Sequence, residues 1–256
     1  MNILEEFLTS NIYAWMLIFA RVGTAFVLLP GFSAPYVDVR MRVAIALALS
    51  LLLMPSLVGK LPTQPVSVLA LTLLFTGEIL VGAFLGVVGR VLVGALQTAG
   101  VLLAMFASLA NALTQDPIVE QQSATVATLL STIGLVLVFA TDLHHLMLVA
   151  VADSYSLFDP NTAFQVGDVA DLLAHKVDDS FAIGLQLSAP FLIVSMTYYV
   201  GLGMISRLSP QMQAFFFAAM PLQIMVQIAV LTMTLSSIML VFLRYFQDGF
   251  TPFLAP

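Results

Sequence analysis

Residues 66–89 read VSVLALTLLFTGEILVGAFLGVVG, an apolar run that contains one charged residue, Glu78. A helix needs about 18 or more consecutive apolar residues to cross the hydrocarbon core of a bilayer. The length and composition of this run are therefore typical of a membrane-spanning helix. A second apolar run, 91–110, follows directly after Arg90. We expect the two runs to form either a tight helical hairpin or one long helix broken around Arg90.

The composition of the whole chain indicates the same class of protein. Of the 256 residues, 61% are hydrophobic and 9% are charged, and the mean hydropathy is +1.06. Soluble domains carry about 25% charged residues, so this chain has too few charges to cover a water-facing surface. The absence of cysteine excludes disulfides and thiolate-bound metals. A net charge of −6 without any basic run argues against a nucleic-acid partner.

We therefore expect an all-α integral membrane protein, with about six to seven hydrophobic helices that are kinked or paired in hairpins. The whole chain, 1–256, is expected to form a single membrane domain. Its parts would be N-terminal helices (1–125), a broken helix with an acidic loop (126–180) and a C-terminal helical hairpin (181–256). The remaining apolar runs are 12–29, 41–58, 126–152, 181–206 and 218–243. Clustered aspartates mark residues 153–180 as a loop outside the membrane.

Charged residues inside apolar runs are the first candidates for function. Glu78, Gly82, Gly86 and Arg90 are spaced four apart and so share one helical face. Glycines at this spacing allow a second helix to approach closely, which would place the charges in a protein interface rather than in lipid. We therefore favour an ion pair or hydrogen bond that fixes assembly over a proton or ion site at Glu78. Arg21, within the run 12–29, is interpreted in the same way.

The segment that contains Asp142, His144 and His145 superficially resembles a metal or acid–base site. A metal site needs three or four ligands at compatible spacing, and the only other histidine, His175, lies in the acidic loop. The pattern therefore favours a polar helix break at an interface, where the chain turns back around residues 141–145. No metalloprotease, nucleophile-elbow or phosphate-loop motif is present. We expect neither an enzyme nor a cofactor.

Two further segments carry polar residues at membrane depth. Gln223 and Gln227 are four apart and form a polar stripe on an apolar helix, which should meet other helices or a lumen. Residues 105–117 leave an apolar helix, become small and polar, and meet Pro117, which disfavours helix at Asp116. Non-helical backbone at membrane depth is tolerated only inside protein or beside a water-filled cavity. The alternative for this segment is a plain periplasmic loop.

Five blocks of sequence, in order along the chain, are similar to one known family. They are LPGFS at 29–33, VRMRVA at 39–44, GEILVGAFLG at 77–86, Asp116-Pro117, and GMISRLSPQM at 203–212. Together they resemble the FliR/SctT family of type III export gate subunits. The last block resembles the family's turn between its final two helices.

The resemblance implies a core subunit of the flagellar type III protein export gate, needed for flagellum assembly. Such a subunit is a multi-pass protein of the bacterial inner membrane in the flagellar basal body. It would form the secretion channel with FliP and FliQ and work with FlhB and FlhA, and exported flagellar proteins would be its substrates. The alternatives are the equivalent subunit of a virulence injectisome, or a stand-alone secondary transporter that uses Glu78, Asp142 and Arg21.

The resemblance also implies roles for particular segments. Residues 106–122 would form a plug loop that helps to close the resting channel. The turn at 207–211, between the last two apolar runs, would lie at the cytoplasmic mouth of the channel. The residues assigned to the plug are Met105, Phe106, Asn111, Gln115, Asp116, Pro117 and Gln122, and those assigned to the cytoplasmic turn are Arg207, Pro210 and Gln211.

Overall fold

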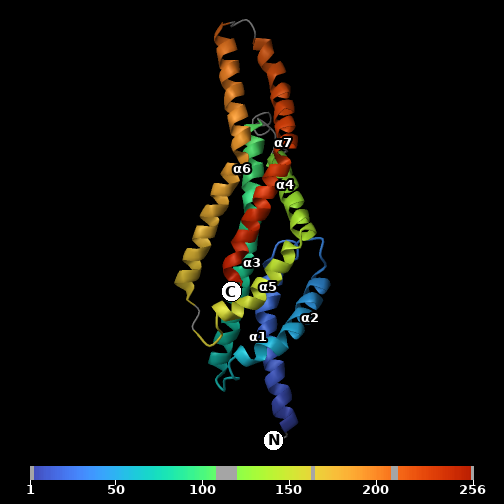
Figure 1. Ribbon diagram of the computed structural model, residues 1–256, viewed down its shortest axis with the longest axis vertical. Coiled ribbons are helices and arrows are strands. Elements are labelled where there is room, and N and C mark those ends of the chain that lie inside the picture. The colour runs from blue at the N-terminus through green and yellow to red at the C-terminus, as the bar shows by residue number, and fades with distance from the viewer. Residues whose placement is uncertain (1–2, 108–119, 163–164, 209–212, 255–256) are drawn as a thin grey trace. The chain divides into compact units, whose positions relative to one another are not determined.

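The computed structural model describes residues 3–107, 120–162, 165–208 and 213–254. Over these ranges the chain folds into seven α-helices and two short 3₁₀ helices, without a strand (Figure 1). The all-α class expected from the sequence is confirmed. The elements are α1 (Ile3–Leu28), α2 (Val39–Leu57), η1 (Val58–Lys60), α3 (Val68–Phe106), α4 (Glu120–Ala140), α5 (Leu143–Leu157), α6 (Val166–Leu208), α7 (Gln213–Phe250) and η2 (Thr251–Phe253).

Five helical stretches are long and apolar enough to cross a membrane. They are Asn11–Leu28, Val39–Lys60, Val68–Phe106, Val166–Ile205 and Pro221–Phe253. The pair formed by α4 and α5 is bent by 75° at a short break and gives a sixth span if it is counted as one. The described part of the chain is thus a multi-pass helical protein, as the apolar runs predict.

The third helix differs from both alternatives drawn from the sequence. The runs 66–89 and 91–110 were expected to form a hairpin or a helix broken around Arg90, but α3 continues through Arg90 for 39 residues. Its length is about 58 Å, almost twice the ~30 Å of a bilayer's hydrocarbon core. The Arg90 guanidinium donates to the carbonyl oxygens of Leu28 (2.8 Å) and Val27 (3.4 Å) in the last turn of α1. Because those carbonyls lack partners within α1, they satisfy the arginine without a break in α3.

The segment 153–180, expected to be a loop, is mostly helical. α5 continues to Leu157, and α6 already begins at Val166. Asp168 lies in the first turn of α6, where a carboxylate interacts favourably with the helix dipole. Between the two helices, the Asp159 carboxylate accepts hydrogen bonds from the backbone and side-chain nitrogens of Asn161 at 2.8 and 2.7 Å. These donors hold the pKa of Asp159 below its usual value.

The helices group into two compact units. The first contains Met1–Leu92, Phe139–Val177 and Phe246–Pro256, and the second contains Val93–Val138 and Asp178–Tyr245. In the first unit the core is built from α1, α3, α5 and the end of α7; its fully buried side chains include Leu17, Ile18, Phe26, Leu85, Val88, Val151 and Phe250. In the second unit α3, α4, α6 and α7 contribute Leu96, Leu130, Val138, Phe191 and Phe242.

Candidate functional site

A buried ion pair joins the first and third helices. Arg21 Nε lies 2.7 Å from Glu78 Oε2, and Arg21 Nη2 lies 2.9 Å from Glu78 Oε1, so the pairing is bidentate. Both side chains are almost completely buried. A charge buried in an apolar interior is tolerated only when it is paired and hydrogen-bonded. Each of these two residues is therefore the other's counter-ion, and neither faces lipid as an isolated charge.

The fifth helix completes the surroundings of Arg21. Its Nη1 donates to the Ser154 hydroxyl, and its Nη2 donates to the carbonyl of Phe158, both at 3.0 Å. The guanidinium carbon lies 3.7 Å from the centre of the Tyr155 ring, an arrangement typical of a cation–π contact. One arginine thus connects α1, α3 and α5. The partners of its guanidinium named here all belong to the first unit.

α1 crosses α3 at Gly82 and Gly86. A Cβ added to Gly82 would collide with the backbone carbonyl of Arg21, and one added to Gly86 would collide with the Cβ of Leu28. The close approach expected at this glycine-lined face therefore exists, and the helix that occupies it is α1 of the same chain. Because the α1 backbone lies this close, the Arg21 side chain reaches Glu78.

A second polar cluster surrounds the end of α3. The carbonyl of Phe106, the last residue of this helix, accepts hydrogen bonds from the Ser195 hydroxyl and from Gln223 Nε2 (3.0 Å). Gln227 Nε2 donates to Ser195 Oγ at 2.8 Å and to the carbonyl of Phe191 at 3.2 Å. All three polar side chains are buried. The polar stripe of α7 therefore contacts α3 and α6, one of the two possibilities considered from the sequence.

The predicted plug and turn fall largely outside the described residues. Asn111, Gln115, Asp116 and Pro117 belong to 108–119, and Pro210 and Gln211 belong to 209–212. Among the others, Met105 is half exposed in the last turn of α3, Gln122 lies in the first turn of α4, and Arg207 is exposed in the last turn of α6.

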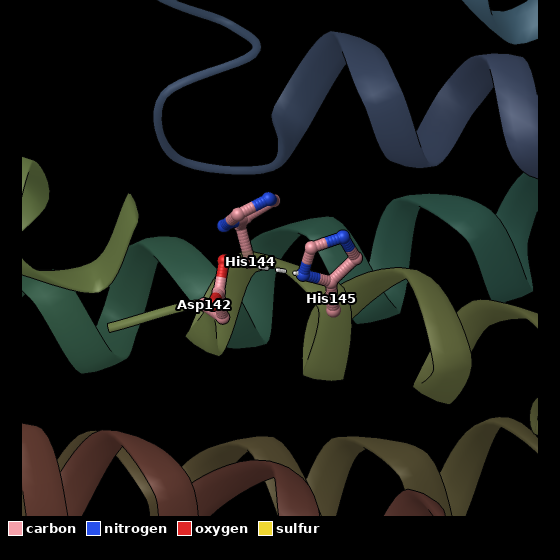
Figure 2. Close-up of side chains that lie close together, drawn as sticks. All are labelled: Asp142, His144 and His145. Carbon is pink, nitrogen blue, oxygen red and sulfur yellow. Dashed lines mark ion pairs between the residues drawn. The ribbon is translucent and has the colours of Figure 1, made fainter. Parts of the chain in front are cut away.

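The helix break expected at 141–145 is present between α4 and α5. Asp142 has a left-handed backbone conformation (φ 59°, ψ 12°). The two helices are bent by 75° at this break, which makes the pair a broken span or a re-entrant loop, and the turn back expected from the sequence stays a prediction. The His144 ring stacks on Phe139 with centroids 4.9 Å apart, and the His144 and His145 rings lie 4.1 Å apart. Figure 2 shows Asp142, His144 and His145 gathered at this break. His145 Nδ1 lies 3.6 Å from Asp142 Oδ1.

The fold and the buried pair define a multi-pass helical membrane protein in which Arg21 and Glu78 neutralise each other within the chain. Residues 12–249 match the family of bacterial export proteins, family 1. The chain belongs to this family, which contains the FliR and YscT proteins, and it is a component of a type III export gate. Members of the family transport proteins and are not enzymes.

Individual relatives align with almost the whole chain. It is 35% identical to the flagellar biosynthetic protein FliR of Caulobacter vibrioides over 238 residues, which cover 93% of this chain and 94% of the relative. It is 29% identical to the FliR of Bacillus subtilis, covering 89% and 88% of the two chains. The Yop proteins translocation protein T of Yersinia pestis is 26% identical, covering 86% and 85%.

Sequence reasoning missed several members of these clusters. It treated Arg21 and Glu78 separately, although opposite charges in two different apolar runs are natural partners. It also did not single out Tyr155, Ser154 or Ser195. Small hydroxyl residues are common in membrane helices, because their hydroxyls can bond to the backbone of their own helix. Nothing in the sequence around Ser195 separates it from such cases.

Proposed function

We propose that this chain is a core subunit of the flagellar type III protein export gate in the bacterial inner membrane, within the flagellar basal body. The observation that carries the proposal is its similarity to FliR of Caulobacter vibrioides, which extends over 93% of the chain. The injectisome-type relative is less similar, at 26% identity. This difference favours export for flagellum assembly.

In this role the chain forms a secretion channel together with FliP and FliQ and works with FlhB and FlhA. Exported flagellar proteins pass through the channel. Three helices expose large apolar side chains, which lipid or the neighbouring subunits of the gate would cover. These side chains include Leu51 and Leu52 of α2, Ile193, Met196 and Val200 of α6, and Met225 and Met233 of α7.

Residues 106–122 form the plug of this channel. The support comes from the two helices that flank the segment, since both are held by close contacts in the second unit. A Cβ on Gly100 of α3 would overlap the backbone of Ala127 in α4, so these helices touch. The end of α3 is anchored through Phe106 to α6 and α7. The helices on both sides of the segment therefore pack within the second unit.

The test replaces residues 108–119 with a Gly/Ser segment of equal length in cells that co-express the partner subunits. We expect the inner membrane to become permeable to ions and small solutes, measured as dye uptake and loss of membrane potential. The control replaces residues 61–67, the connection between η1 and α3, in the same way. If the complex assembles and permeability stays at the wild-type level, the plug assignment is wrong.

A virulence injectisome is the second candidate, supported by the relative from Yersinia pestis. Complementation separates the two: we expect the chain to restore motility to a strain that lacks its own FliR, and not to restore secretion to a strain that lacks the injectisome subunit. The stand-alone transporter receives less support, because Arg21 and Glu78 neutralise each other in a buried pair rather than lining a path for ions.

A further inference from the structure

Three potential metal ligands converge at the break between α4 and α5. Asp142, His144 and His145 each offer one ligand atom, and these atoms all lie within 4.8 Å of one another. Figure 2 shows the three side chains directed toward a common space at the start of α5. The sequence alone favoured a polar helix break here, and the structure contains both the break and the cluster.

The backbone explains how four consecutive residues can present three side chains to one place. Asp142 precedes the first turn of α5 in a left-handed conformation, which aspartate tolerates better than most residues. Its carboxylate makes no capping hydrogen bond to α5. The carboxylate is therefore free to serve another partner, beside the two histidines of the first turn.

The chemistry of the cluster fits a metal better than it fits a hydrogen-bond network. The distance of 3.6 Å between Asp142 Oδ1 and His145 Nδ1 is too long for a good hydrogen bond. The Nδ1 atom of His144 is covered by protein and has no hydrogen-bond partner. A buried polar atom without a partner is costly, and a bound cation would supply the missing one. Imidazole nitrogens with one carboxylate are a common ligand set for zinc and its neighbours.

We propose that Asp142, His144 and His145 bind one divalent transition-metal ion of the zinc class. Three protein ligands leave a fourth tetrahedral position for water or for a ligand from a partner. Ligand–metal bonds of about 2.0–2.2 Å require the ligand atoms to move closer together. The exposed side chains of Asp142 and His145 have room to do so. The bound ion ties Asp142, the residue before α5, to the first turn of that helix.

The experiment uses the purified full-length chain in nanodiscs, stripped with a chelator and titrated with Zn²⁺ in competition with a chromophoric indicator. We expect one zinc per chain. His144→Ala and His145→Ala should each abolish this binding, and Asp142→Asn should weaken it while it preserves tolerance for the left-handed backbone. The control is His175→Ala, which removes an exposed histidine of α6 outside the cluster and should leave the stoichiometry at one.

A second readout separates this site from loose surface binding. Zinc should raise the melting temperature of the wild type and of His175→Ala, and should not change that of His145→Ala, whose exposed position makes misfolding of the variant a poor explanation. Co²⁺ in place of zinc should give the visible absorption of a tetrahedral site. Absence of stoichiometric binding, or binding that persists in the His144→Ala/His145→Ala double variant, overturns the proposal. Neither result bears on the export function.

Discussion

At the scale of single residues, the buried pair of Arg21 and Glu78 is the interaction with the largest expected effect. Removal of one partner leaves the other as an uncompensated buried charge, which typically costs about 3–5 kcal/mol. We expect Glu78→Gln and Arg21→Leu each to destabilise the protein by roughly that amount. The double variant Arg21→Leu/Glu78→Gln should lose much less than the sum of the two, because no charge remains unpaired.

The loss of stability in these variants can be measured with a fluorophore that the chain already contains. Its only tryptophan, Trp15, lies on α1, the helix that carries Arg21. Thermal unfolding in detergent or nanodiscs can therefore be followed by tryptophan fluorescence. Single variants as stable as the wild type would show that the pair has no structural role.

A second residue-scale prediction concerns the glycines of α3. Gly82→Ala places a Cβ against the backbone carbonyl of Arg21, which cannot move away as a flexible side chain could. We expect a loss of about 1–3 kcal/mol, typical of overpacking. Gly77 belongs to the same helix and has nothing within 4 Å of an added Cβ. Gly77→Ala should therefore be neutral or slightly stabilising through its better helix propensity. Equal effects of the two substitutions in the same unfolding assay would contradict the close helix crossing.

At the scale of elements, the end of α3 is held by polar side chains from α6 and α7. Gln223→Leu leaves the Phe106 carbonyl with one donor fewer, and we expect a loss of about 1–3 kcal/mol. If the flanking helices position the plug, the same variant should also raise membrane permeability when the partners are present. Thr232→Val is the matched control, because Thr232 is an exposed residue of α7 whose hydroxyl donates within its own helix, to the carbonyl of Ala229.

Combining Gln223→Leu with Ser195→Ala tests whether the two residues act together. Both donate to the same carbonyl, so their effects on stability should be non-additive. If the two effects on stability add strictly, the two residues do not act together. If Thr232→Val raises permeability as much as Gln223→Leu does, this cluster does not position the plug.

The break between α4 and α5 gives a further element-scale prediction. Asp142 is the only non-glycine residue with a positive φ in the described part of the chain. Glycine adopts this conformation freely, whereas a β-branched residue is strained by about 1–3 kcal/mol. In metal-free buffer, Asp142→Gly should therefore keep the wild-type melting temperature, and Asp142→Val should lower it. The opposite order would mean that the left-handed turn is not the native conformation.

Elements were predictable from the sequence where a local signal decides them. The apolar run 41–58 predicts a helix that the structure contains as α2 (Val39–Leu57), and the polar residues around Asp142 mark a break that exists. Two features of the helices were not predicted, for one reason: the residue that determines each of them lies far away in the sequence. Arg90 interrupts an apolar run, yet α3 continues because the carbonyls of Leu28 and Val27 satisfy the guanidinium. The pairing of Arg21 with Glu78, 57 residues away, is equally invisible to a local pattern.

The acidic stretch shows a different failure. Clustered aspartates at 168, 171, 178 and 179 predict a loop, but they occupy exposed positions of a regular helix. Composition indicated correctly that the stretch is polar. It does not distinguish a solvated helix from a solvated loop, because both tolerate exposed charges.

At the scale of the whole molecule, the protein has few charged residues and many exposed apolar side chains. α2 illustrates this, since only Ala46, Ser50 and Leu57 of its residues are buried. An exposed apolar helix needs lipid or sister subunits around it. We therefore expect the chain purified alone in mild detergent to aggregate or to lose its fold at lower temperature than the co-purified complex. Size-exclusion chromatography combined with thermal unfolding measures the difference, and equal stability of the two preparations would contradict it.

The measurement that addresses the central claim most directly is native mass spectrometry of the chain co-expressed with its FliP-like and FliQ-like partners. A gate subunit predicts one defined complex that contains this chain together with both partners in fixed ratio. A stable free monomer that never joins the partners and transports solutes by itself in liposomes would contradict the account.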